Sequence, residues 1–166
     1  MEETKKQAKQ QQLIIALKAQ LHQRKQYDKV VIQKIIALAK DGSQLLVTGG
    51  TGSFGKAFIR EVLNQTTGIE RIVIYSRDEL KQWEMQQEMP ANEYPQLRFF
   101  LGDVRDRDRL SRALEGIDTV IHAAGIAGID TVIKQPVRTM RVNMIGTANA
   151  LEAAQINEIS NRFIDF

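Results

Sequence analysis

Cysteine is absent from the 166-residue chain, which excludes disulfide bridges and thiolate metal sites. Histidine is scarce as well: His22 and His122 are the two imidazoles, and they lie far apart in the sequence, so we expect no metal site. No apolar run approaches the ~20 residues that a membrane-spanning helix requires, and the first residues lack the apolar core of a secretory signal. We therefore expect no membrane span and a cytoplasmic location.

Positive charge is concentrated towards the N-terminus. Residues 1–43 hold nine Lys and Arg against four Asp and Glu, whereas the net charge of the whole chain is +3. Apolar residues at helical spacing in this Gln- and Lys-rich region predict two helices, about 4–22 and 29–40. We interpret residues 1–42 as a basic helical extension that packs over the sheet, self-associates or docks a partner. Nucleic acid is not an expected partner, because Tyr27 is the only Phe, Trp or Tyr in this extension.

A glycine-rich segment joins an apolar strand to a helical pattern. The strand Gln44–Thr48 leads into glycines at positions 49, 52 and 55, and a helix is predicted over 54–64. Gly49 allows a tight turn off the strand, Gly52 lets backbone approach a phosphate, and Gly55 lets the helix pack closely. A pyrophosphate would then meet free N–H groups and the positive end of the helix dipole. This order predicts a dinucleotide-binding unit, and the alternative is a glycine-rich turn that binds nothing.

Strands and helices alternate from residue 43 onward. The predicted strands are Gln44–Thr48, Arg71–Tyr75, Leu97–Leu101, Thr119–His122 and Arg162–Phe166. The predicted helices are 54–64, 78–88, 106–114 and a long one near 137–155. The strands are short and apolar on both faces, which is typical of a parallel sheet covered by helices. We therefore expect an α/β fold over residues 43–166: a Rossmann-like doubly wound parallel sheet of about five strands in the order 3-2-1-4-5.

The end of the second strand indicates which dinucleotide binds. NAD-binding folds commonly place a carboxylate at this strand tip, where it accepts hydrogen bonds from the ribose. Here Ser76 and Arg77 stand at the tip, and a hydroxyl beside a guanidinium suits a 2′-phosphate through charge-assisted hydrogen bonds. We therefore favour NADP, with NAD as the alternative because Asp78 follows directly. We interpret Asp78 as the N-cap of the next helix.

The end of the third strand supplies candidates for binding the adenine. Asp103 is placed to accept a hydrogen bond from the adenine amino group, and Val104 to pack on the ring. The alternative role for Asp103 is a helix N-cap, but Asp106 already serves the following helix in that way.

The end of the fourth strand carries small side chains. Ala123, Ala124 and Gly125 leave room there for ribose and nicotinamide. We interpret His122 as a packed residue rather than a base. Further on, Asn143 lies inside a helical pattern, where a buried amide needs a specific hydrogen-bond partner. It is either a satisfied core amide or a support for the active-site backbone or a water.

These motifs together resemble the extended short-chain dehydrogenase/reductase family, which comprises nucleotide-sugar epimerases and dehydratases. The resemblance covers about residues 44–166, and residues 47–124 look most like UDP-N-acetylglucosamine 4,6-dehydratases of polysaccharide biosynthesis. It implies NADP as the cofactor and a nucleotide sugar as the substrate. The cofactor contacts that it implies are Gly49, Gly52, Ser53, Phe54, Gly55, Ser76, Arg77, Asp103 and Val104. From Gly125 onward the sequence is more similar to other members, and Ile126 and Ala127 stand where the dehydratases commonly have a lysine.

The family's catalytic pair is Tyr-x-x-x-Lys, in which the tyrosine is the acid/base and the lysine lowers its pKa. None of Tyr27, Tyr75 and Tyr94 has a lysine four positions later, so no catalytic residue is predicted. We expect the sequence to stop before this pair and the Rossmann domain to be incomplete on its C-terminal side.

Two functions follow from this resemblance. In the first, the chain is the NADP-binding part of a nucleotide-sugar 4,6-dehydratase or epimerase, and a longer protein, a homo-oligomer or a partner chain completes the enzyme. In the second, it is a catalytically inactive NADP(H)-binding or sensing module that docks a partner through residues 1–42.

Overall fold

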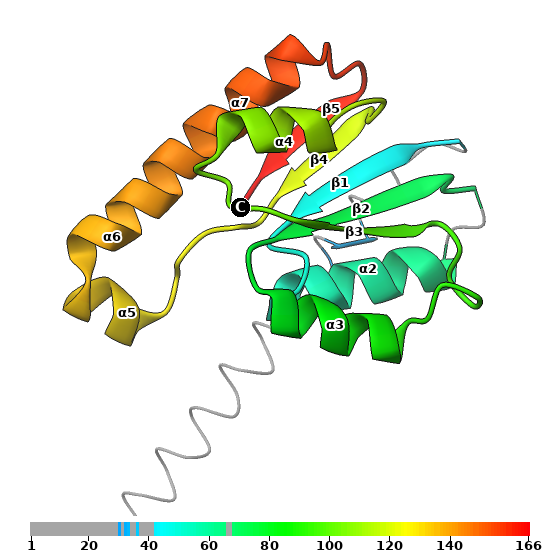
Figure 1. Ribbon diagram of the computed structural model, residues 1–166, viewed down its shortest axis with the longest axis horizontal. Helices are drawn as coiled ribbons and strands as arrows, with labels where there is room; N and C mark the ends of the chain where they lie inside the picture. The colour runs from blue at the N-terminus through cyan, green and yellow to red at the C-terminus, as the bar shows by residue number, and fades with distance from the viewer. Residues whose placement is uncertain (1–29, 31, 34–35, 37–41, 66–67) are drawn as a thin grey trace, which may run out of the picture. The chain divides into compact units, whose positions relative to one another are not determined.

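The computed structural model describes residues 30, 32–33, 36, 42–65 and 68–166 (Figure 1). Contacts divide the chain into two units, Met1–Leu38 and Ala39–Phe166. The predicted helix 4–22, and with it most of the expected basic extension, lies outside the described residues. Of the predicted helix 29–40, the structure describes four residues, all helical: Val30, Ile32, Gln33 and Ile36.

Parallel strands form one five-stranded sheet within the described residues. The strands are β1 (Gln44–Thr48), β2 (Arg71–Ser76), β3 (Leu97–Leu101), β4 (Thr119–His122) and β5 (Arg162–Asp165). Their order is β3-β2-β1-β4-β5, so the predicted order is confirmed. Thr48 at the end of β1 lies opposite Tyr75 of β2 and His122 of β4. The carboxyl ends of these strands therefore meet at one edge, where open α/β sheets bind their ligands.

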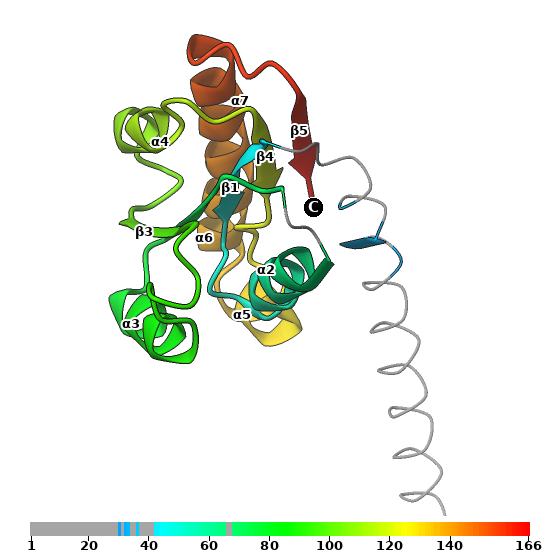
Figure 2. The same cartoon turned by 90° about the vertical axis from the view of Figure 1, so that its right-hand side faces the viewer.

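Helices cover both faces of the sheet, as Figures 1 and 2 show. α2 (Ser53–Gln65) and α3 (Glu79–Glu88) lie on one face, and α4 (Arg107–Ala113) and α7 (Gly146–Ile156) lie on the other. α3 and α4 begin at the predicted N-caps, because the carboxylates of Asp78 and Asp106 accept hydrogen bonds from the first turns of these helices. Both capping predictions are confirmed.

The segment after β4 differs from the single long helix predicted near 137–155. α5 (Ile129–Lys134) comes first, followed by α6 (Pro136–Met140), a π-helical turn η1 (Arg141–Ile145) and then α7. α5 is six residues long and buries none of them, and so short a segment gives only a weak helical pattern in the sequence. Pro136 occupies the first turn of α6, where its missing N–H needs no partner.

The core on the face covered by α4 and α7 is built from alternate strand residues. Leu46, Val73 and Val120 point into one cluster with Leu110 of α4 and Ala153 of α7. Since successive strand residues point to opposite faces, their neighbours in β1 and β2 are buried beneath the other pair of helices. Burial on both faces explains why β1, β2 and β4 read as largely apolar runs.

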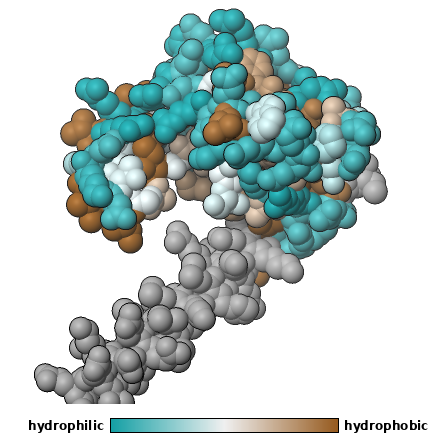
Figure 3. All heavy atoms as spheres, turned by 60° about the horizontal axis from the view of Figure 1, so that its bottom comes forward, coloured by the Kyte–Doolittle hydropathy of each residue, from teal (hydrophilic) through white to brown (hydrophobic). Residues whose placement is uncertain are grey.

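Apolar side chains are exposed on the helices that follow β4. Ile129 and Ile133 of α5 and Val137 of α6 are each at least two-thirds exposed, and Figure 3 shows hydrophobic atoms gathered over these two helices. Within the described part of the chain, no helix is both long and apolar enough to cross a membrane.

Candidate functional site

A cleft of about 270 Å³ lies at the carboxyl edge of the sheet. Nine of the thirteen predicted cofactor-binding residues line it: Gly49, Gly52, Ser76, Arg77, Asp103, Val104, Ala123, Ala124 and Gly125. They come from the ends of β1, β2, β3 and β4 and the loops that follow. Parallel strands thus bring together residues that are up to 76 positions apart in the sequence.

The loop after β1 is shaped by its glycines. Gly49 has a φ of +66°, and a Cβ at this position would lie 2.5 Å from the carbonyl oxygen of Ala123. A Cβ on Gly55 would lie 2.5 Å from the Cα of Gly50, so the first turn of α2 packs on the loop itself rather than on the strand. This close packing requires glycine, because real Cβ atoms are not found at such distances.

The first turn of α2 faces this loop with backbone N–H groups that make no backbone hydrogen bond within the described residues. The N–H of Lys56 already bonds to the Gly52 carbonyl, whereas the groups of Ser53, Phe54 and Gly55 precede the first intrahelical bond. No acidic side chain lies in this turn, so the positive end of the helix dipole is not neutralised locally. The loop and the helix end therefore fit a pyrophosphate.

Ser76 at the end of β2 is held by side chains from two directions. It is 8% exposed, and its hydroxyl oxygen accepts hydrogen bonds from Thr51 Oγ1 at 3.1 Å and Gln82 Nε2 at 3.3 Å. Gln82 Nε2 also donates to the carbonyls of Ser76 and Phe100. A hydroxyl can donate one hydrogen bond while accepting others, so Ser76 can direct its hydrogen towards a ligand.

Two basic side chains follow Ser76 in the lining of the cleft. The side chain of Arg77 is 46% exposed, and its Nη1 lies 3.9 Å from Asp103 Oδ2. Lys81 Nζ lies 3.3 Å from Asp78 Oδ2. The backbone N–H of Lys81 donates to the Asp78 carboxylate, which lowers the pKa of Asp78. Asp78 is thus engaged as a helix cap, and Arg77 is the exposed cation at the strand tip.

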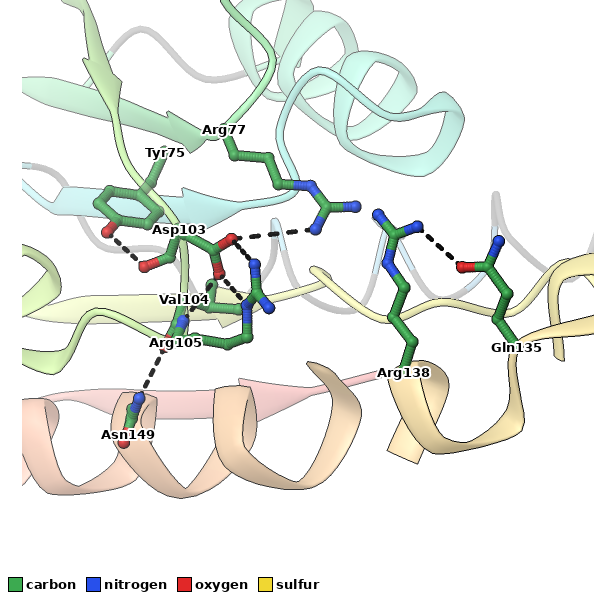
Figure 4. Close-up of polar contacts among 8 residues, drawn as sticks. All are labelled: Tyr75, Arg77, Asp103, Val104, Arg105, Gln135, Arg138 and Asn149. Atoms are coloured by element: carbon green, nitrogen blue, oxygen red, sulfur yellow. Dashed lines mark hydrogen bonds and ion pairs between the residues drawn. The ribbon is translucent and has the colours of Figure 1, made fainter. Parts of the chain in front are cut away.

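Asp103 and Val104 after β3 are fixed through both backbone and side chain (Figure 4). Tyr75 Oη donates to the Asp103 carbonyl at 2.9 Å, and Asn149 Nδ2 of α7 donates to the Val104 carbonyl at 3.0 Å. Arg105 Nη2 lies 2.7 Å from Asp103 Oδ2, and its side-chain hydrogen bonds are the main reason that the pKa of Asp103 is lowered.

Tyr75 is a structural donor beneath the cleft. Its side chain is fully buried and its ring stacks on Phe100 with centroids 5.8 Å apart. Burial, followed by the charge of Asp106, raises the pKa of Tyr75 to about 12. The hydroxyl therefore remains protonated at neutral pH and keeps its hydrogen bond to Asp103.

His122 is a packed residue, as predicted. It is 3% exposed, its Nδ1 lies 2.9 Å from Thr48 Oγ1, and its ring stacks on Phe163. Burial lowers the pKa of His122, although Asp165 acts in the opposite direction. The imidazole is therefore neutral at pH 7.

Asn143 acts on the backbone beyond β4 rather than lining the cleft. Its Oδ1 accepts from the N–H of Ile126 at 2.8 Å, and its Nδ2 donates to the Ile126 carbonyl at 3.1 Å. The residue lies in the π turn η1, a local conformation that often occurs at functional sites. Asn143 thus holds the loop that follows Ala123, Ala124 and Gly125, which matches the backbone-support alternative.

Some residues in or near the cleft have no distinctive pattern in the sequence. Thr51 and Lys81 line the cleft, but a threonine in a glycine loop and a lysine in a polar helix have no distinctive pattern. Asn149 is recognisable only from the fold, since it reaches Val104 across 45 positions of sequence. Over the described ranges, no group of three or more His, Cys, Asp or Glu is arranged to hold a metal ion.

Comparisons with known sequences agree with this geometry. The profile of the family described as "Polysaccharide biosynthesis protein" matches residues 45–164. A UDP-N-acetylglucosamine 4,6-dehydratase (inverting) from Campylobacter jejuni subsp. jejuni serotype O:23/36 (strain 81-176) is 41% identical over 119 residues, which are 72% of this chain and 34% of the relative. A UDP-glucose 4-epimerase from Rickettsia bellii (strain RML369-C) is 39% identical over 118 residues, 70% of this chain and 34% of the relative. The chain thus spans about a third of the length of the curated relatives that it matches.

Solved structures share the fold. Pen from Bacillus thuringiensis superposes with a TM-score of 0.69 at 28% identity, covering 75% of this chain and 37% of that chain. DesIV, a dTDP-glucose 4,6-dehydratase from Streptomyces venezuelae solved with NAD and TYD bound, superposes with a TM-score of 0.63 at 27% identity, covering 72% of this chain and 38% of that chain.

Proposed function

Since this chain belongs to the polysaccharide biosynthesis protein family, and with it to the extended short-chain dehydrogenase/reductase nucleotide-sugar dehydratases and epimerases, we propose that its cleft binds NADP. We further propose that it is the cofactor-binding part of a nucleotide-sugar 4,6-dehydratase with a UDP-N-acetylglucosamine-type substrate. Two UDP-N-acetylglucosamine 4,6-dehydratases, 41% and 43% identical to this chain, support this substrate, and the UDP-glucose 4-epimerases at 38–39% identity support the broader assignment to nucleotide-sugar enzymes.

Arg77 is the observation that carries the NADP assignment. A guanidinium that is 46% exposed stands at the tip of β2, and the next carboxylate, Asp78, is engaged in capping α3. A 2′-phosphate at this tip would gain charge-assisted hydrogen bonds from Arg77 and the Ser76 hydroxyl, with Lys81 nearby in the cleft lining. The NAD named with the structural relative DesIV belongs to that protein.

Each group of predicted cofactor-binding residues has a role in this proposal. Ser53, Phe54 and Gly55 direct backbone N–H groups at the pyrophosphate, with Gly49 and Gly52 shaping the loop. Asp103 and Val104 receive the adenine, and Ala123, Ala124 and Gly125 leave space for the nicotinamide ribose. Bound NADP would supply the hydride acceptor for oxidation at the sugar C4. Asn143 keeps the loop at Ile126 in place beside it.

A titration with NADP and NAD, followed by calorimetry, tests the cofactor assignment. The wild-type chain should bind NADP more tightly, and Arg77→Gln should weaken NADP about tenfold or more while leaving NAD nearly unchanged, since a charge-assisted hydrogen bond contributes roughly 1.5–3 kcal/mol. Arg107→Gln is a matched control, because Arg107 pairs with Asp108 and Glu152 and does not line the cleft. Equal losses of NADP affinity in both variants, or tighter binding of NAD by the wild type, would overturn the assignment.

Catalysis in this proposal requires groups beyond those described. Tyr75 is buried and bonded to Asp103, and four positions after it stands Glu79 rather than a lysine. The 166-residue chain should therefore bind cofactor without converting a UDP-sugar. Turnover of UDP-N-acetylglucosamine by this chain alone would contradict this part of the proposal. The alternative of a non-catalytic NADP(H) sensor predicts instead a partner retained by residues 1–42 in a pull-down.

We propose that another polypeptide chain packs against the helices after β4. Val137, Met140, Met144 and Leu151 are 50–67% exposed, and they recur at three-, four- and seven-residue spacing along α6, η1 and α7. Such a stripe supports a helix-to-helix contact with another copy or a partner chain.

The cytoplasm is the proposed location, because the sequence has neither an apolar run of membrane-spanning length nor a secretory signal pattern.

A further inference from the structure

The carboxylate of Asp103 is shared unequally between two arginines (Figure 4). Arg105 makes a two-nitrogen contact, with Nε 3.0 Å from Oδ1 and Nη2 2.7 Å from Oδ2. Arg77 lies at 3.9 Å from Oδ2, the outer limit of an ion pair. The cleft cation therefore holds Asp103 weakly, whereas Arg105, which lies outside the cleft lining, holds it closely.

The acceptor capacity of Asp103 explains this division. An ionised carboxylate offers about four lone-pair positions. Oδ1 accepts from both the backbone N–H and the Nε of Arg105, and Oδ2 accepts from Arg105 Nη2. Only part of the Oδ2 capacity is left for Arg77. The close pair with Arg105 thus keeps Asp103 from drawing Arg77 into a two-nitrogen pair of its own.

We propose that Arg105 determines the preference for NADP over NAD, by holding Asp103 so that Arg77 is free to move to the 2′-phosphate. This inference rests on the proposed function, in which Arg77 binds that phosphate. Arg105 is a positioning residue here, because it acts through Asp103 and does not itself touch the cofactor. Departure of Arg77 also opens the fourth acceptor position of Asp103 for the adenine amino group.

Loss of the two-nitrogen contact of Arg105 should strengthen the ion pair between Arg77 and Asp103 and so reduce the preference for NADP. Asp103 would stay in place, because the backbone N–H of Arg105 still donates to Oδ1 at 2.9 Å. Arg77 would then become its available guanidinium partner, and NADP would have to break a closer ion pair to bind. NAD needs no cation at the 2′ position, so its affinity would be less affected. The quantity that reports the effect is the ratio of the NAD and NADP dissociation constants.

Arg105→Lys is the decisive variant, since it keeps the charge but loses the planar two-nitrogen contact. We expect the dissociation-constant ratio to fall by up to roughly fivefold, the upper end of the range for an exposed ion pair. Asp103→Asn in the Arg105→Lys background should restore the ratio, because a neutral amide no longer captures Arg77. Arg107→Lys, at an exposed arginine that pairs elsewhere, is the matched control and should leave the ratio unchanged.

The outcomes separate this inference from the proposed function. A wild-type chain that prefers NAD, or binds neither dinucleotide, would overturn both. A wild-type chain that prefers NADP, together with an unchanged ratio in Arg105→Lys, would overturn the role of Arg105 alone. Weaker binding of both cofactors by the same factor would also overturn it, since that result indicates a purely structural role. Failure of Asp103→Asn to restore the ratio would show that Asp103 is not the intermediary.

Discussion

Gly49→Ala should destabilise the domain and weaken cofactor binding together. The backbone at Gly49 has a φ of +66°, and placing an L-residue in this left-handed region costs roughly 1–2 kcal/mol. The new Cβ would also lie 2.5 Å from the Ala123 carbonyl oxygen, and overpacking of this kind costs about 1–3 kcal/mol. We therefore expect the free energy of unfolding to fall by roughly 2–5 kcal/mol, a large part of the ~5–15 kcal/mol typical of a domain.

Gly42→Ala provides a matched control for the backbone term. Gly42 has a φ of +80°, but a Cβ there would have no atom within 4 Å. The two variants share the left-handed penalty, so their difference isolates the clash, about 1–3 kcal/mol. Urea unfolding measures the stability of both variants, and an NADP titration measures how the substitution in the loop after β1 changes NADP affinity. Equal stability of the two variants, or unchanged NADP affinity in Gly49→Ala, would refute the close contact between the loops after β1 and β4.

Three further predictions concern the other parts of the site. Asn149→Leu should lose the hydrogen bond to Val104 and weaken NADP and NAD by a similar factor in calorimetry; a change confined to one cofactor would contradict a positioning role. The lowered pKa of Asp103 means that its ionised form stabilises the fold above the pKa of an unfolded Asp, and that this contribution is lost as the pH falls through the folded pKa. The stability difference between wild type and Asp103→Asn, measured by urea unfolding from about pH 7 down to pH 3, should therefore narrow towards acid; a constant difference would be inconsistent with it. Met144→Lys should reduce self-association or partner binding in sedimentation velocity, whereas Glu152→Gln should not, and a wild-type chain that remains monomeric and binds no partner would exclude the proposed contact.

Secondary structure could be predicted where local chemistry and burial agree. The strands from β1 to β4 are apolar runs bounded by polar or glycine residues, and two are followed by a capping Asp that the structure confirms at Asp78 and Asp106. The strand order 3-2-1-4-5 is expected by analogy with doubly wound folds, whose crossovers are right-handed. α5 is harder to predict in this way, because six residues are too few for the helical spacing of Ile129, Val132 and Ile133 to stand out.

Long-range side-chain contacts were beyond the reach of sequence patterns. The sequence at the tip of β2 predicts that Ser76 and Arg77 bind a cofactor phosphate, since they adjoin in sequence and stand at a strand end. The side chain of Tyr75 points to the opposite face of the sheet from that of Ser76. Nothing in the local sequence indicates that it would donate a hydrogen bond to the Asp103 carbonyl 28 positions later. The π turn around Asn143 is likewise a product of tertiary structure, because its amide bonds to Ile126 in a different segment.

The backbone after β3 is held in place by two other elements of the fold. Two consecutive carbonyls, of Asp103 and Val104, are held by donors from different elements, Tyr75 in β2 and Asn149 in α7. With the backbone fixed, the carboxylate of Asp103 can vary only through its partners, Arg105 and Arg77. A small electrostatic difference between these two arginines can then change cofactor preference without moving the main chain, because the surrounding hydrogen bonds resist any other response. In the proposed site, the choice between NADP and NAD would therefore depend on how Arg77 and Arg105 pair with Asp103, on a backbone that the fold has already set.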